Sequence, residues 1–191
     1  MKFHKDMLLL YAVTDRKWTG RHTLYEQIED ALKGGATMIQ LREKDLPEGA
    51  YLELAGKVQE ICDRNQVPLI LHFYPEAAKQ LGLPVVHLPL WKFAEAGEDG
   101  SLETGVSVHS AEDVRRAEKL GAAYLTAGHI FATDCNKGLA PRGLSFLKEI
   151  CEQTELPVYG IGGIRLDAEQ IRTVLEQGAA GVCIMSQMMR M

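Results

Sequence analysis

His129 stands at the end of an apolar run and opens a loop that carries several groups able to do chemistry. The stretch reads TAGHIFATDCNKGLAPRG over residues 126–143, so Thr133, Cys135 and Lys137 follow the histidine closely. An imidazole with a pKa near neutrality can both accept and return a proton at cellular pH. Cys135 has no neighbour in sequence that would serve as its base, so we interpret it as a pocket-lining residue. A lone histidine among apolar residues is more often structural, but its place at a strand end favours a catalytic role for His129.

A glycine-rich turn offers a second kind of chemistry. In YGIGGIRLDAEQ, Gly160, Gly162 and Gly163 lie between an apolar run and a helical stretch. Bare backbone amides at such a turn can enclose a phosphate, and the dipole of the following helix favours its negative charge. The alternative is that the glycines only permit a tight turn. We favour the phosphate site.

A compact charged run, LREK, ends a third apolar stretch with Arg42, Glu43 and Lys44. The planar guanidinium of an arginine can hold a carboxylate or a phosphate through two parallel hydrogen bonds. A solvated surface cluster is the usual explanation of such a run. At the end of a strand, however, binding of an anionic ligand group by Arg42 is the interpretation we favour.

Neither the histidines nor the cysteines are spaced as metal ligands. His72, His87 and His109 lie on separate apolar runs, and the four cysteines include no C-x-x-C pair. We therefore expect no metal site, no cofactor and no disulfide framework. Cysteines scattered in this way are typical of a cytoplasmic protein with reduced thiols.

Composition is that of an ordinary soluble globular protein. The chain has 191 residues, 46% of them apolar and 25% charged, which fits one domain over residues 1–191. A formal net charge of −5 and the lack of a basic patch argue against nucleic acid as a partner. No apolar run approaches the roughly 20 residues that a membrane helix needs. The sequence leaves open whether the chain forms a homo-oligomer.

Short apolar runs alternate with longer amphipathic stretches along the chain. The amphipathic stretches begin at cap residues such as Ser110 and Asp167 and end at Gly35, Gly121 and Gly178. Most of the apolar runs are continuous, as expected for parallel strands that are covered on both faces. The runs expected to be strands are MLLLYAVT, MIQLRE, PLILHF, VVHLP, GVSVH, AYLTAGHI, PVYGIGG and GVCIM.

Eight strands in strict alternation with helices predict a compact (β/α)8 TIM barrel, with its functional groups at the carboxyl ends of the strands. A flavodoxin-like open sheet is the alternative, but it normally uses fewer strands. Residues 90–103 are rich in glycine and acidic residues, so we expect a reduced helix after strand four. We expect little or no eighth helix. In such a barrel the loop IMSQ, with Met185 and Ser186, would share a phosphate with the glycine-rich turn.

Four stretches, in order, resemble the thiamine phosphate synthase superfamily: YAVTDR, ALKGGATMIQLREK, GVSVHSAEDVRRAEKLGAAYLTAGHIF and YGIGGI. The resemblance covers nearly the whole chain and implies a TIM barrel that handles a thiazole phosphate. The synthase branch has an Asn-Asp pair after strand three and a Gly-Gln-x-Asp stretch after strand four, and it needs Mg²⁺. Here the two places read LILHFYPEAA and HLPLWKF. The synthase also has a proline where this chain has His129.

The loop GHIFATDCNKGLAPRG instead resembles the thiazole tautomerase (TenI-like) branch. This resemblance implies a cofactor-independent isomerase of thiamine biosynthesis. Its substrate would be a carboxylated thiazole ethyl phosphate tautomer, which a histidine would convert to the aromatic form by acid/base proton transfer. The residues implied are His129 for catalysis and, for substrate binding, Arg42, Lys44, Thr133, Lys137, Gly162, Gly163, Met185 and Ser186.

Two other functions remain open beside the tautomerase. One is thiamine phosphate synthase itself, which couples a pyrimidine pyrophosphate to a thiazole phosphate. The other is a non-catalytic regulatory protein that binds the thiazole phosphate. Formation of thiamine phosphate would identify the first, and ligand binding without turnover would identify the second.

Overall fold

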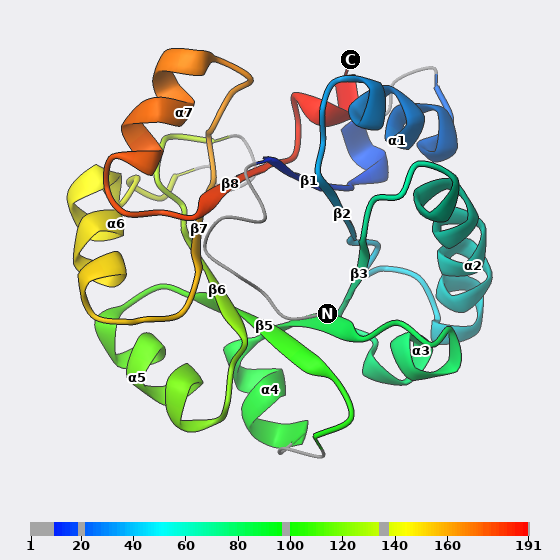
Figure 1. Ribbon diagram of the computed structural model, residues 1–191, viewed down its shortest axis with the longest axis horizontal. Coiled ribbons are helices and arrows are strands. Elements are labelled where there is room, and N and C mark those ends of the chain that lie inside the picture. Colours follow the sequence, from blue (N-terminus) through cyan, green and yellow to red (C-terminus); the bar gives the residue numbers. More distant parts are fainter. Residues whose placement is uncertain (1–9, 19–21, 97–99, 134–137, 191) are drawn as a thin grey trace.

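Eight parallel strands close into a barrel in chain order, as the ribbon in Figure 1 shows. The computed structural model describes residues 10–18, 22–96, 100–133 and 138–190. The closed barrel confirms the predicted TIM-barrel fold and excludes an open sheet. The strands are β1 Leu10–Val13, β2 Met38–Leu41, β3 Leu69–His72, β4 Val85–Pro89, β5 Glu103–Val108, β6 Tyr124–Gly128, β7 Val158–Ile161 and β8 Gly181–Ile184.

Seven α-helices surround the barrel in the described residues, each on the outer side of the strands (Figure 1). The helix after β4 has only seven residues, which agrees with the predicted reduction. After β8 the described residues form only the short 3-10 helix η3, Met188–Arg190. A second 3-10 helix, η1, spans Arg16–Trp18. The α-helices are α1 Leu24–Lys33, α2 Glu48–Arg64, α3 Pro75–Gln80, α4 Leu90–Ala96, α5 Ala111–Lys119, α6 Gly143–Glu152 and α7 Ala168–Leu175.

The helix ends follow the predicted caps. The side chain of Ser110 accepts a hydrogen bond from the backbone N–H of Asp113, and Asp167 does the same for Gln170. Gly35 follows the end of α1 with a φ of +95°, a conformation that costs glycine little because it has no Cβ. Sequence alone therefore locates these helix boundaries.

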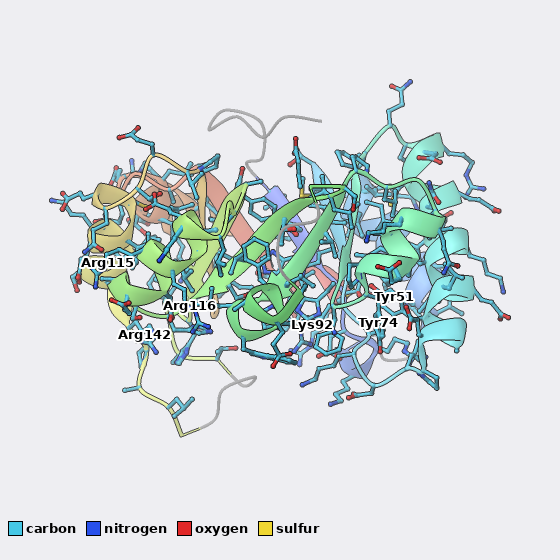
Figure 2. The ribbon with its side chains drawn as sticks, turned by 90° about the horizontal axis from the view of Figure 1, so that it is seen from below. Tyr51, Tyr74, Lys92, Arg115, Arg116 and Arg142 are labelled. Atoms are coloured by element: carbon cyan, nitrogen blue, oxygen red, sulfur yellow. The ribbon has the colours of Figure 1, made fainter. Side chains whose placement is uncertain are left out.

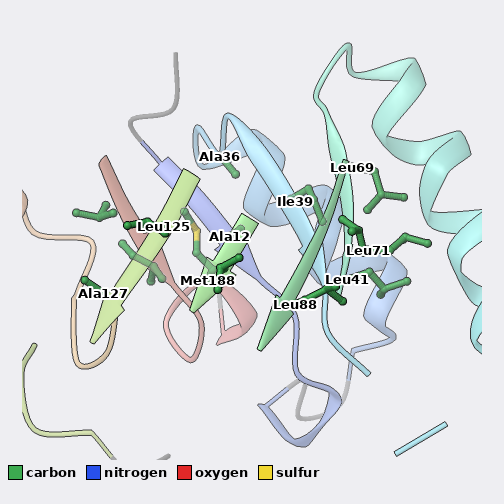
Figure 3. Close-up of a cluster of buried hydrophobic side chains, with 14 of the residues drawn as sticks. Ala12, Ala36, Ile39, Leu41, Leu69, Leu71, Leu88, Leu125, Ala127 and Met188 are labelled. Carbon is green, nitrogen blue, oxygen red and sulfur yellow. The ribbon is translucent and has the colours of Figure 1, made fainter. Parts of the chain in front are cut away.

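Alternation along each strand separates two apolar layers. Side chains such as Ile39, Leu71 and Leu125 point outward and pack beneath the helices, and Figure 3 shows part of this layer. Side chains at the alternate positions of the strands, such as Met38 and Tyr124, point inward and fill the inside of the barrel. Inward-pointing residues near the carboxyl ends of the strands therefore face the mouth of the barrel.

Tyr124 is the central side chain of the inner layer. It is fully buried, and its hydroxyl lies 3.0 Å from the hydroxyl of Tyr11 and 3.1 Å from Nδ1 of His87. Its ring occupies the space beside Gly105 on the neighbouring strand, where a Cβ would overlap the ring. Gly105 is thus required because Tyr124 fills the place of its missing side chain.

The substitution Gly105→Ala should destabilise the protein by about 1–3 kcal/mol, the usual cost of overpacking a filled core. Urea unfolding measures the change. The matched control is Gly49→Ala near the start of α2, where no atom lies within 4 Å of the added Cβ, and its stability should not fall. Equal stabilities of the two variants would contradict the role assigned to Tyr124.

Candidate functional site

A cavity of about 260 Å³ opens at the carboxyl ends of the strands. It brings together seven of the nine residues predicted from the sequence, which come from loops after β2, β6, β7 and β8. A cavity of about 340 Å³ adjoins it at the carboxyl ends of β4 and β5 and shares Ser107 and His109. Another of about 400 Å³ is at the opposite end of β3 and β4, away from where barrels place their chemistry. The wall of the mouth cavity comprises Arg42, Ser107, His109, Thr126, Gly128, His129, Thr133, Ile161, Gly162, Gly163, Ile164, Cys183, Met185 and Ser186.

Two predicted residues are not on this wall. Lys44 lies on an exposed turn after β2, beyond the cavity itself. Lys137 lies outside the described residues, as does Cys135. The prediction that Lys137 binds substrate therefore stays a prediction.

His129 follows directly after β6 and is largely buried, with 9% of its surface exposed. Two backbone hydrogen bonds fix the segment that follows it: Ile130 donates to the carbonyl of Ile161, and Phe131 donates to that of Gly162, both at 2.9 Å. Nε2 of His129 lies 3.4 Å from the carbonyl oxygen of Leu139. The ring is thus held on the cavity wall next to the glycine-rich turn after β7.

Gly162 and Gly163 pack against this segment so closely that no side chain would fit. Their φ angles are +98° and +69°, and a Cβ on Gly162 would overlap the side chain of His129. A Cβ on Gly163 would lie 2.5 Å from the carbonyl oxygen of Ala132. Both glycines therefore allow the turn to pack closely on the segment after β6. They also line the cavity, so their backbone forms part of its wall.

Two details of the predicted phosphate loop are wrong. Gly160 faces outward, where a Cβ would meet Val174 on α7 at 2.9 Å, so this glycine serves helix packing and not a ligand. The helix α7 begins only at Ala168, and the side chain of Asp167 already accepts the N–H of Gln170. The amino end of α7 is therefore occupied by its own cap, and the turn itself must supply the amides.

The run LREK divides between the two sides of the barrel wall. Arg42 points inward and lines the cavity, and its Nη1 lies 3.7 Å from Oδ2 of Asp15. Glu43 takes the outward parity, where its carboxylate accepts hydrogen bonds from Thr14 at 3.3 Å and from Nε of Arg16 at 2.8 Å. Burial raises the pKa of Glu43, although the bonds from Arg16 and Thr14 oppose this. Glu43 thus anchors the loop that presents Arg42.

Seven wall residues were not among the nine predicted, and three of these carry hydroxyl or imidazole groups: Ser107, His109 and Thr126. The hydroxyls of Ser107 and Thr126 lie 3.2 Å apart, and Ser107 Oγ lies 2.8 Å from Nε2 of His87. Nδ1 of His109 lies 2.8 Å from the carbonyl oxygen of Gly128, which steadies the residue before His129. Counting alternate positions back along β5 and β6 would have indicated all three, since they share the inward parity.

His72 and His87 form a neutral floor beside the cavity. Their rings stack with centroids 5.9 Å apart, His72 at the end of β3 and His87 in the middle of β4. Burial, assisted by the positive charges of Arg42 and Lys44, lowers the pKa of His72 to about 3. Burial, assisted by His72, lowers the pKa of His87 well below its ordinary value. Both imidazoles are therefore uncharged near neutral pH.

The low pKa of His72 predicts a pH dependence of stability. Between about pH 6.5 and pH 3 the unfolded chain takes up a proton at this residue that the folded protein does not. The free energy of unfolding should therefore fall with decreasing pH, and this residue should contribute up to about 1.4 kcal/mol per pH unit.

Urea titrations at several pH values should show this slope reduced in the variant His72→Asn between pH 6 and pH 4. Above pH 7 the imidazole is neutral in both folded and unfolded states, so the slopes of the two proteins should coincide there. An unchanged slope at low pH would mean that His72 is protonated in the folded protein.

No helix within the described ranges is both long and apolar enough to cross a membrane. The cytoplasmic location predicted from the cysteines stays a prediction.

The protein is thus a TIM barrel with a cavity at the carboxyl ends of its strands. The guanidinium of Arg42, the imidazole of His129 and the backbone of Gly162 and Gly163 line this cavity. Residues 10–188 match the family model described as thiamine monophosphate synthase. The chain therefore belongs to this family of enzymes. It is 38% identical to a thiamine-phosphate synthase of Clostridium acetobutylicum, over 93% of this chain and 85% of the relative. It is 40% identical to a thiamine-phosphate synthase of Desulfitobacterium hafniense, over 93% and 87%.

A solved structure gives the same result. The thiamine phosphate pyrophosphorylase from Pyrococcus furiosus superposes with a TM-score of 0.83 and 31% identity, over 98% of this chain and 90% of that one. The superfamily predicted from the sequence is confirmed. The prediction of a thiazole tautomerase is wrong, because these relatives are named as synthases. The loop residues around His129 that favoured the tautomerase branch carried less information than the similarity over the whole chain.

Proposed function

We propose that the protein is a thiamine-phosphate synthase, which couples a pyrimidine pyrophosphate to a thiazole phosphate. The observation that carries this proposal is the similarity over more than nine-tenths of the chain to proteins named for that activity. The cavity at the mouth of the barrel supports it, because its volume of about 260 Å³ suits a small heteroaromatic phosphate. The reaction joins two substrates, so the mouth must hold two anionic groups.

The thiazole phosphate would bind at the β7–β8 side of the cavity. Gly162, Gly163 and the loop with Met185 and Ser186 line this side. Backbone amides hold a phosphate without the conformational cost of ordering long side chains. A phosphate fixed there would place the attached ring toward the middle of the cavity.

His129 and Thr133 would contact the ring of the bound thiazole. Both line the cavity, and His129 packs directly on the turn that would hold the phosphate. Ser107 on β5 and Thr126 on β6 line the same cavity with their hydroxyls. Holding the ring between these groups orients its nitrogen toward the second substrate, which is the main contribution a protein makes to such a coupling. That His129 is itself catalytic stays a prediction.

The family implies Mg²⁺, but the residues present do not fit it. Mg²⁺ prefers carboxylate oxygens and water as ligands. The described residues contain no group of three His, Cys, Asp or Glu side chains that would hold a metal ion. After β3 the chain has His72 and Phe73, and the segment after β4 presents Trp91 and Lys92. We therefore assign no step of the reaction to a metal ion.

Incubation of the protein with both halves and Mg²⁺ should yield thiamine phosphate, detected by mass spectrometry. Gly162→Ala should weaken binding of the thiazole phosphate by about tenfold or more, equivalent to about 1.4 kcal/mol, because the new Cβ displaces His129. The matched control is Gly35→Ala, which has a similar φ of +95° but no atom within 4 Å of the added Cβ.

Each outcome of this experiment has a distinct meaning. If the thiazole phosphate binds and no thiamine phosphate forms, the synthase proposal fails and a ligand-binding regulatory protein takes its place. If Gly35→Ala and Gly162→Ala weaken binding equally, the loss reflects backbone strain and not the proposed phosphate turn.

A further inference from the structure

At one edge of the barrel mouth, positively charged side chains surround the stacked rings of His72 and Phe73. We name this edge the β2–β4 edge and define it by Arg42, Lys44, His72, Phe73 and Lys92. Nζ of Lys92 lies 3.9 Å from the ring centroid of Phe73, and that ring stacks on His72 at 6.2 Å. Lys92 is in the first turn of α4, and in Figure 2 its label lies toward the lower edge, near that of Tyr74.

Arg42 and Lys44 add positive charge near His72. Both guanidinium and ammonium groups lower the pKa of His72, so both act on that ring through space. Arg42 also lines the cavity. Three cations therefore border the floor formed by His72 and Phe73.

Carboxylates also lie near this edge: Asp45 and Glu48 raise the pKa of Tyr74, whose ring lies 5.5 Å from that of Phe73. Asp15 is the carboxylate closest to Arg42 in the described residues and is already paired with it at 3.7 Å. Glu43 points to the outer side of the barrel, where Arg16 and Thr14 bind it. A divalent cation placed here would be repelled by the like charges of Arg42, Lys44 and Lys92.

We propose that this chain holds the anionic group of its second substrate at the β2–β4 edge without a divalent metal ion, through Arg42, Lys44 and Lys92. The inference rests on the proposed function, which supplies a pyrophosphate as that group. Two or three side-chain cations can neutralise a pyrophosphate directly, as the metal does elsewhere.

Backbone geometry at Phe73 supports the same conclusion. Phe73 has a φ of +79°, a left-handed conformation that bulky side chains rarely adopt and that Asn and Asp tolerate better. The position therefore suits a short polar residue, and an aspartate would place a carboxylate there. Instead the chain carries an aromatic ring that supports the Lys92 ammonium.

Isothermal titration calorimetry with inorganic pyrophosphate tests the inference on the full chain. Pyrophosphate should bind in the presence of EDTA with an affinity within about twofold of that in Mg²⁺, and Mg²⁺ alone should give no heat of binding. Arg42→Gln should weaken pyrophosphate binding by about tenfold, and Lys92→Met by about two- to fivefold, the range for a partly exposed charge. The control Lys148→Met, on the exposed face of α6, should leave the affinity unchanged.

A gain of metal dependence provides a second readout. The double variant His72→Asn, Phe73→Asp should bind pyrophosphate more tightly with Mg²⁺ than with EDTA, since it supplies oxygen ligands at the end of β3. Pyrophosphate binding by the wild type that is abolished by EDTA would overturn the inference. The absence of pyrophosphate binding in both conditions would overturn it as well. Binding of the thiazole phosphate, measured on the same sample, reports separately on the proposed function.

Discussion

Closure of eight short parallel strands into a barrel is the constraint on which the rest of the structure depends. It forces alternate side chains either into the barrel or beneath the helices, with no third place. Each strand contributes only four to six residues, so only one or two inward positions remain near its carboxyl end. Those few positions must carry every group that meets a ligand, together with the loops that follow them.

The strand ends around the mouth of the barrel differ in the chemical groups that they present. Along β7 and β8 the chain removes side chains and exposes backbone at Gly162 and Gly163. Along β3 and β4 it inserts buried imidazoles that stay neutral, while the loop after β2 adds positive charge through Arg42. One side is therefore suited to a phosphate held by amides, and the other to an anion held by side-chain cations.

Sequence reasoning predicted the barrel because alternating apolar runs and capped helices are local signals. It placed Arg42, His129 and Gly162 on one cavity because these residues follow strand ends, which a barrel brings together. It assigned no role to Ser107 or Thr126, although alternation along β5 and β6 points both inward; only their 3.2 Å hydrogen bond depends on the register of β5 against β6. The sequence also predicted that the dipole of α7 would help the glycine-rich turn to bind a phosphate, but the side chain of Asp167 caps the amino end of that helix.

The choice between branches of the family failed for a different reason. It rested on a few residues of one loop, and function is a property of the complete site and not of the fold or of one segment. Cys135 and Lys137, on which that choice partly depended, lie outside the described residues. Similarity along the whole chain favoured the synthase.

A crystal structure of the protein soaked with the thiazole phosphate tests most directly the claim that the glycine-rich turn is a phosphate site. We expect phosphate oxygens at hydrogen-bond distance, about 2.7–3.2 Å, from the backbone nitrogens of Gly162 and Gly163, with the ring beside His129. A phosphate bound instead at the β2–β4 edge, with the turn unoccupied, would contradict it.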